Sequence, residues 1–245
     1  MGLAREKARR GVLLGGLLLA LLLGPSPARA APVDVALVLA VDVSESVDAD
    51  EYELQHEGIA RAFESEPLIA AIAGGTKGAI DVLVLEWSDR DKQVVTVDWT
   101  RISDAASAKA FAKSVRATRR SSNGLTAIGD ALLAAQAAFL RLPDTADRRI
   151  IDVSGDGMAN IGPPPQQVRD ELVASGITIN GLAILKTEPW LDQYYDQNVV
   201  GGPGGFLIQI EDFPSFVSAM QQKLLAEVAA ARPRGRAAFL ARQIQ

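Results

Sequence analysis

The 245-residue sequence has no cysteine, one histidine and few aromatic residues. Without cysteine the chain can form no disulfide, thiolate metal site, iron–sulfur cluster or lipid-modified cysteine anchor. A single histidine excludes histidine-rich zinc sites and two-histidine proton relays. Any bound metal ion must therefore be held by oxygen. Aromatic residues make up only 5% of the chain, so its core must be mostly aliphatic. The 48% hydrophobic and 22% charged residues exclude collagen, general disorder and a multi-span membrane protein.

The first thirty residues, 1–30, have the pattern of a secretory signal peptide. A basic segment (5–10) precedes an uncharged apolar run, 12–24, that is shorter than the roughly 20 residues of a membrane span. Ala28-Arg29-Ala30 is typical of a cleavage site, so we expect cleavage before Ala31. The mature chain would then be periplasmic or secreted and not bound to the membrane. An uncleaved anchor is the alternative, and the export route, general or twin-arginine, stays open.

Removal of this segment makes the protein more acidic. Residues 1–30 hold five of the 25 basic and one of the 30 acidic residues, which leaves 20 against 29 and a net charge of −9. We expect no nucleic-acid partner, because phosphate contacts need a basic face. At the other end, residues 231–245 contain four arginines together with Pro233 and Gly235. We interpret them as a basic C-terminal tail rather than a partner-binding helix.

Residues 31–230 alternate apolar runs with amphipathic segments. The nearly continuous, Val-rich run 33–41 is typical of a strand buried on both faces of a parallel sheet. The order predicts one α/β domain, with a doubly wound, mostly parallel six-stranded sheet, helices on both faces and one antiparallel edge strand from a hairpin. The other predicted strands are 80–87, 93–97, 149–153, 177–185 and 206–210, and the predicted helices are 50–64, 105–115, 126–142, 165–174 and 212–230.

Oxygen-bearing side chains gather where these elements meet. Asp42, Ser44 and Ser46 follow the first strand, Thr126 begins a helix and Asp156 follows the fourth strand. Ligands of doubly wound sheets bind beyond the carboxyl ends of the strands. Each motif alone is equally typical of a helix cap or a turn, but their joint placement favours a hard cation, Mg²⁺ or else Mn²⁺ or Ca²⁺. Neutral hydroxyl ligands leave such an ion short of negative charge, which a partner's Glu or Asp would supply.

This combination resembles a von Willebrand factor type A (vWA) domain over residues 33–230. That family carries D-x-S-x-S after the first strand, a Thr before a helix, and an Asp in a T-D-G-like turn after the fourth, which together form a metal-ion-dependent adhesion site. In the family the hydroxyls usually bind the ion directly and the acids often bind through water. Gly155 stands where Thr is usual. Gly155 and Gly157 flank Asp156, and we expect them to permit a tight turn. The resemblance implies five metal ligands, namely Asp42, Ser44, Ser46, Thr126 and Asp156.

The function implied is metal-dependent protein binding rather than catalysis. Trp87-Ser88, 126–130 and 201–204 also resemble a bacterial family of exported vWA-like proteins with no established activity. Two alternatives are a metal-dependent hydrolase or phosphatase and a structural domain with an empty site. Against an enzyme, Ser44 stands where haloacid-dehalogenase-type phosphatases need a second Asp, and the serine-hydrolase motif G-x-S-x-G is absent.

Five further residues have separate predictions. We expect His56 to be a solvated surface residue and Asp130 to be an exposed helix carboxylate rather than a support for the site. Trp190, Tyr194 and Tyr195 either line a recognition surface or cover the core, and the sequence does not decide between these two roles.

Overall fold

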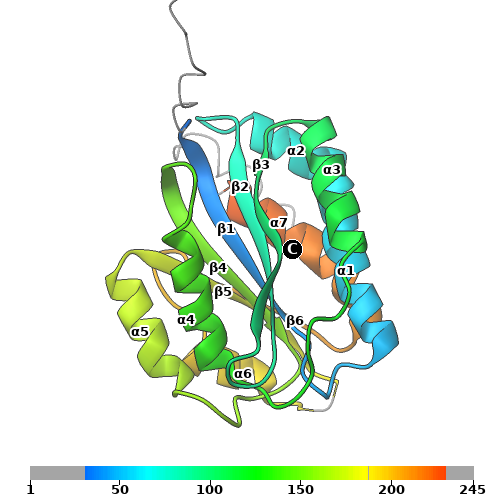
Figure 1. Ribbon diagram of the computed structural model, residues 1–245, viewed down its shortest axis with the longest axis vertical. Helices are drawn as coiled ribbons and strands as arrows, with labels where there is room; N and C mark the ends of the chain where they lie inside the picture. The colour runs from blue at the N-terminus through cyan, green and yellow to red at the C-terminus, as the bar shows by residue number, and fades with distance from the viewer. Residues whose placement is uncertain (1–30, 187, 230–245) are drawn as a thin grey trace, which may run out of the picture.

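A six-stranded sheet in the order β3-β2-β1-β4-β5-β6 forms the middle layer of the computed structural model, which describes residues 31–186 and 188–229 (Figure 1). All neighbouring strands are parallel except β2 and β3, which form the antiparallel edge hairpin. The predicted sheet is therefore confirmed, whereas the predicted signal peptide (1–30) and the predicted basic tail (231–245) fall outside the described residues. The strands are β1 (Val33–Asp42), β2 (Ile80–Trp87), β3 (Gln93–Ile102), β4 (Ala146–Gly155), β5 (Ile177–Ile184) and β6 (Leu207–Ile210).

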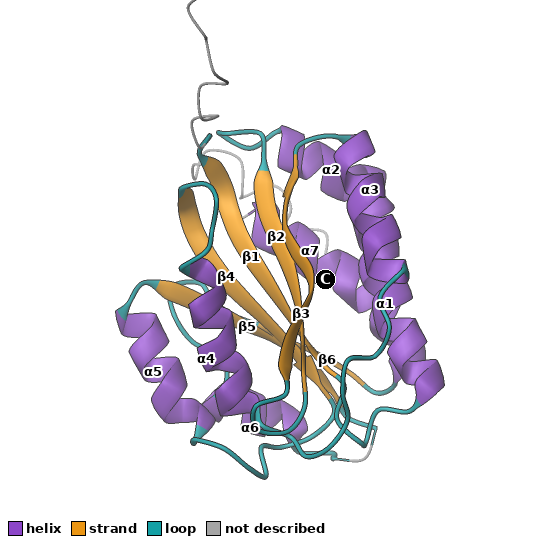
Figure 2. Ribbon diagram, viewed as in Figure 1, coloured by secondary structure: helices purple, strands orange, loops and turns teal. Residues whose placement is uncertain are grey.

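Helices cover both faces of this sheet (Figure 2). One face carries α1, α2, α3 and α7, and the other carries α4, α5 and α6. No helix in the described part of the chain is long and apolar enough to cross a bilayer. The helices are α1 (Ala49–Glu64), α2 (Glu66–Ala73), α3 (Ala105–Arg116), α4 (Ile128–Phe139), α5 (Pro165–Ala174), α6 (Leu191–Asn198) and α7 (Phe216–Ala229).

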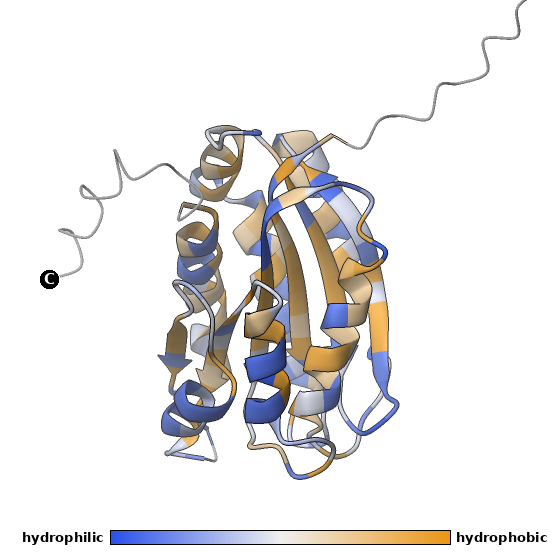
Figure 3. Cartoon of the chain, turned by 90° about the vertical axis from the view of Figure 1, so that its left-hand side faces the viewer, coloured by the Kyte–Doolittle hydropathy of each residue, from blue (hydrophilic) through white to orange (hydrophobic). Residues whose placement is uncertain are grey.

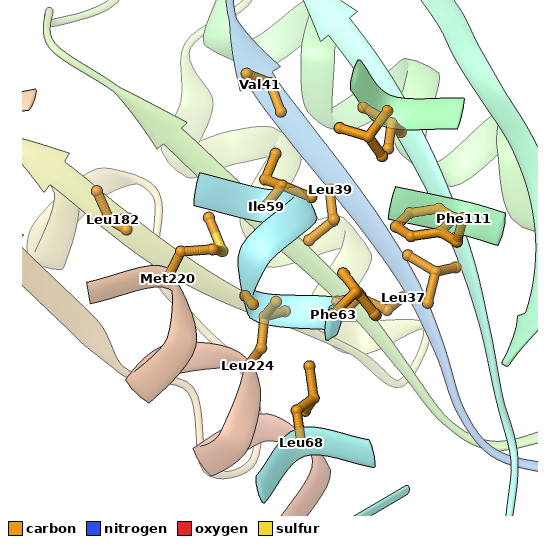
Figure 4. Packing of buried hydrophobic residues seen from close by; sticks show 14 of the residues in the cluster. Leu37, Leu39, Val41, Ile59, Phe63, Leu68, Phe111, Leu182, Met220 and Leu224 are labelled. Carbon is orange, nitrogen blue, oxygen red and sulfur yellow. The ribbon is translucent and has the colours of Figure 1, made fainter. Parts of the chain in front are cut away.

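Strand β1 supplies both cores, because all ten of its residues are buried. Successive side chains of a strand point to opposite faces, so Leu37 and Leu39 pack towards α1 while Ala36 and Val38 pack towards α4. Figure 4 shows the packing of aliphatic side chains with Phe63 and Phe111 on the α1 side. In Figure 3 the hydrophobic colour concentrates on the strands between the two helix layers. Packing on both faces of the sheet thereby fixes β1 and its carboxyl end at Asp42.

Two helices were absent from the sequence prediction. Helix α2 follows α1 after a break at Ser65, with Pro67 in its first turn; proline has no N–H to continue the hydrogen-bond ladder of α1. Helix α6 occupies part of the segment that the sequence left as a loop. Strand β3 also runs to Ile102 rather than ending at Val97.

Candidate metal centre

The predicted ligands lie at one edge of the sheet. Asp42 is the last residue of β1, Asp156 follows the last residue of β4, and these two strands are neighbours. The loop after β1 also contacts the segment before α4, since Glu45 N donates to Gly124 O at 2.9 Å. Three chain segments far apart in sequence therefore meet at the carboxyl ends of β1 and β4, as predicted.

Four of the five predicted ligands are linked by direct contacts. Ser44 N donates to Asp42 Oδ1 at 2.7 Å, so the loop curls immediately after the strand. The hydroxyl oxygens of Ser44 and Ser46 are 3.1 Å apart, and Ser46 Oγ donates to Asp156 Oδ1 at 2.6 Å. This curl brings together side chains that an extended D-x-S-x-S segment would spread over about 13 Å.

Thr126 lies against the loop that carries Asp156. Its N–H donates to Asn160 Oδ1 at 2.9 Å, and Asn160 N donates to Thr126 O at 3.1 Å. Its hydroxyl oxygen lies 3.7 Å from the point where a Cβ on Gly157 would stand. Asn160 thus fixes Thr126 beside the other ligands, a role that no sequence motif indicated.

The hydroxyl-bearing ligands are not helix caps. Helix α1 begins with a capping box formed by Asp48 and Glu51, which leaves the two serine hydroxyls uncommitted to it. The N-cap of α4 is Ala127, without any side-chain cap bond, so Thr126 does not cap that helix either. The cap interpretation that the sequence left open for these three residues is therefore wrong.

Two carboxylate oxygens at the site have no partner within the described residues. Asp42 is fully buried and Asp156 is 1% exposed, and the Oδ2 atom of each accepts no hydrogen bond. Such buried oxygens are costly unless another group satisfies them. Burial raises the pKa of Asp42 to about 7, and the nearby Asp156 adds to this rise. Burial likewise raises the pKa of Asp156. A bound cation would relieve both penalties.

The donor set suits a hard divalent cation. Two carboxylates and three hydroxyls offer oxygen alone, which is what Mg²⁺, Mn²⁺ and Ca²⁺ accept. Among the described residues no three acidic or histidine side chains group in a way that would hold a metal ion. The two carboxylates would at most balance the charge of a divalent ion, and the three hydroxyls would add none.

Arg120 fixes the backbone of the loop that follows β1 and carries the predicted ligands Ser44 and Ser46, here called the first ligand loop. Its Nη2 donates to Val43 O at 2.8 Å and to Ser44 O at 2.6 Å, while Nε donates to Ser122 O at 3.1 Å. On the other side, Gln55 Nε2 donates to Asp42 O at 3.0 Å. The sequence reasoning missed Arg120, whose contacts span 76 residues, because pairing over that distance leaves no local pattern.

The expectation for His56 is wrong. The residue is 4% exposed, and its Nε2 lies 3.0 Å from Oε1 of the buried Glu86. Its Nδ1 lies 2.9 Å from Tyr52 O, and Tyr52 Oη donates to the same Glu86 oxygen at 2.8 Å. Glu86, which is itself buried on β2, accepts from Tyr52 Oη and has the imidazole of His56 beside it, so the acidic neighbours of His56 in sequence were a misleading guide to its exposure.

The aromatic residues around α6 differ in burial. Tyr195 on α6 is fully buried in the core, Tyr194 is half-buried, and Trp190 is 70% exposed. Asp130 is half-buried rather than exposed, with its Oδ2 against Gly162. The prediction of an exposed Asp130 is therefore wrong, and within the described residues no hydrogen bond joins its side chain to the five predicted ligands.

The sequence of this chain matches the model of one protein family. The model of a family described as "Protein of unknown function (DUF1194)" matches residues 32–232. The chain belongs to this family. No curated protein matches its sequence.

Solved structures show that this DUF1194 chain has the vWA-like α/β fold. Proximal thread matrix protein 1 from the mussel byssus matches with TM-score 0.60 and 18% identity over 80% of this chain and 48% of its own. The same protein described with a zinc-occupied metal-ion-dependent adhesion site gives 0.58, with 18% identity over 82% and 48%. A von Willebrand factor type A protein from Catenulispora acidiphila gives 0.55, with 17% identity over 81% and 43%. The chain spans about half the length of these proteins.

Proposed function

We propose that this protein is an exported, metal-dependent protein-binding module that captures a partner's Glu or Asp carboxylate on a divalent cation. The proposed ligands are the five oxygen-bearing residues predicted from the sequence, Asp42, Ser44, Ser46, Thr126 and Asp156. The observation that carries the proposal is the pair of buried, partnerless carboxylate oxygens on Asp42 and Asp156 beside three hydroxyls that cap no helix.

Mg²⁺ is the proposed cation, with Mn²⁺ and Ca²⁺ as the alternatives. The mussel protein, whose fold is similar, is described with a zinc-occupied metal-ion-dependent adhesion site, which supports a divalent ion in this chain. The two carboxylates can at most balance the charge of a divalent cation. If the three neutral hydroxyls bind it directly and the carboxylates bind through water, its inner shell holds no anionic oxygen and attracts one from a partner. An acidic side chain of a partner fits that position, and the net acidity of the chain makes the cation necessary for the attraction.

A binding role fits the site better than catalysis. Within the described residues the only histidine, His56, contacts Glu86 and the Tyr52 carbonyl and is not among the contacts of the five ligands. The site thus holds no histidine to act as a general base beside the cation. Turnover in a hydrolase screen with Mg²⁺ or Mn²⁺, lost in Asp42→Ala, would contradict this part of the proposal.

Cation binding is tested by isothermal titration of the protein purified from the exported fraction. Ser46 is an exposed residue, so Ser46→Ala should leave the fold intact while weakening Mg²⁺ and Mn²⁺ binding. Ser218→Ala, which removes an exposed hydroxyl from α7, is the matched control and should bind as the wild type does. A wild-type protein that binds none of Mg²⁺, Mn²⁺ and Ca²⁺ would sink the proposal.

Partner capture needs a separate experiment. Immobilised wild-type protein should retain a partner from the exported fraction in Mg²⁺ and release it into chelator, and the Ser46→Ala protein should retain less. Once the partner is known, replacing its contacting Glu or Asp with the amide should abolish retention. Retention that survives both chelation and that replacement would show that the cation is not the point of attachment.

A further inference from the structure

Tyr195 places its hydroxyl at the edge of the predicted metal site, close to Asp42. The side chain is fully buried on α6, yet its hydroxyl has no hydrogen-bond partner within the described residues. That oxygen lies 2.6 Å from the point where a Cβ on Gly155 would stand, and Asp42 Oδ2 lies 2.8 Å from the same point. Two partnerless buried oxygens from different elements therefore flank one small space at the end of β4.

The two oxygens are chemically matched. A phenol donates one hydrogen bond, and an ionised carboxylate only accepts. Because both oxygens border the same space, a small side-chain rotation or one bridging water joins the donor on Tyr195 to the acceptor on Asp42. A buried polar group that found no such partner would be costly.

The surroundings of Gly155, rather than its backbone conformation, leave no room for a side chain. Gly155 is not among the glycines with positive φ, so its φ does not require a glycine. A side chain at this position would instead press on the hydroxyl of Tyr195 and on the carboxylate of Asp42. Where vWA domains usually carry a Thr side chain, the hydroxyl of Tyr195 from α6 occupies the neighbouring space in this chain.

We propose that Tyr195 is a positioning residue of the metal site, whose hydroxyl replaces the side chain missing at Gly155 and aims the Asp42 carboxylate at the cation. This inference rests on the proposed function. Hydrogen-bond partners behind metal ligands fix the orientation of those ligands, and their loss typically weakens metal binding about 10–100-fold.

The first test compares two neighbouring tyrosines. Tyr195→Phe keeps the buried ring and removes only the hydroxyl, and we expect it to weaken Mn²⁺ and Mg²⁺ binding about 10-fold or more in isothermal titration. Tyr194→Phe is the matched control, because that hydroxyl accepts from Ala159 N at 3.3 Å instead, and it should bind as the wild type does. Equal affinities in wild type and Tyr195→Phe would overturn the proposal.

Rescue separates positioning from packing. In the Tyr195→Phe background, Gly155→Ser returns a hydroxyl to the emptied space, and we expect it to recover most of the lost affinity. Gly155→Ala fills the same space without a donor and should recover none. If the alanine variant recovers as much as the serine variant, the hydroxyl has no role and the proposal is wrong.

A metal-free measurement distinguishes this inference from failure of the proposed function. Without cation, Gly155→Ala alone should lower the melting temperature by roughly 2–12 °C through overpacking, and Tyr195→Phe should relieve much of that loss. Additive losses would refute the pairing of the two positions. The wild type could bind no cation while the two losses in melting temperature are still not additive. In that case Tyr195 and Gly155 do share one space, but the role of Tyr195 in positioning a metal ligand is wrong, together with the proposed function.

Discussion

Lys223 is a fully buried cation, and its replacement by Met tests how the layer of α7 is held to the sheet. Its Nζ lies 2.8 Å from Asp152 Oδ1 on β4 and 2.7 Å from Glu227 Oε1 one turn along α7. Asn180 Nδ2 on β5 donates to the same Glu227 oxygen at 2.7 Å. Burial alone would lower the pKa of Lys223, but Asp152 and Glu227 raise it, so the lysine is charged in the folded protein.

The Lys223→Met variant leaves two buried carboxylates without their cation. Breaking a buried ion pair by removing one partner costs about 3–5 kcal/mol, and we expect a loss of that size in urea denaturation at pH 7.5. Lys113→Met on the exposed face of α3 is the matched control and should change the free energy of unfolding by less than about 0.5 kcal/mol.

The loss should also depend on pH. Burial raises the pKa of Asp152 to about 7, and Lys223 opposes this rise, so in the variant the pKa of Asp152 is higher still. The folded variant then holds its proton to higher pH than the unfolded chain does, and its stability falls as pH rises above about 4. A smaller loss at pH 5 than at pH 8 is expected. A loss below about 1 kcal/mol at every pH would refute the ion-pair reasoning.

Three other predictions concern single side chains. Burial, with help from Asp144, raises the pKa of Asp81 to about 6. The stability of the wild type should fall from pH 4 to 6, because the unfolded chain releases this proton at lower pH than the folded chain does. Asp81→Asn should therefore be more stable than the wild type at pH 8, by up to about 3 kcal/mol in urea titrations. Arg120→Met removes the donors that hold the first ligand loop and should weaken Mn²⁺ binding in isothermal titration. Gly129→Ala should lower the melting temperature, because its Cβ would stand 2.2 Å from Pro163 O.

The sheet could be predicted because its signals are local. The continuous apolar run of β1 indicates a strand buried on both faces, and the short charged turn after β2 indicates a hairpin. Helix α2 was missed because only eight residues follow the break at Ser65, too few for a clear amphipathic period. Helix α6 was missed because its segment is mostly polar, with Leu191 and Tyr195 its buried residues.

The sequence could predict that the five candidate ligands lie close together, but it could not predict the residues that support them. Asp42, Ser44 and Ser46 form a short motif, and strand order brings Asp156 beside them. Partners of the site lie far away in sequence, as Tyr195 does, and nothing in the local pattern marks them. The same reason explains the error at His56, whose burial depends on a carboxylate that comes thirty residues later.

A crystal structure of the wild-type protein grown with Mn²⁺ would show whether the five oxygen-bearing side chains hold a cation. We expect an anomalous scattering peak enclosed by Ser44, Ser46, Thr126 and the carboxylates of Asp42 and Asp156, with one coordination position taken by water or by an acidic group from another molecule. An anomalous peak at other residues, with these five side chains left as they are without metal, would contradict it.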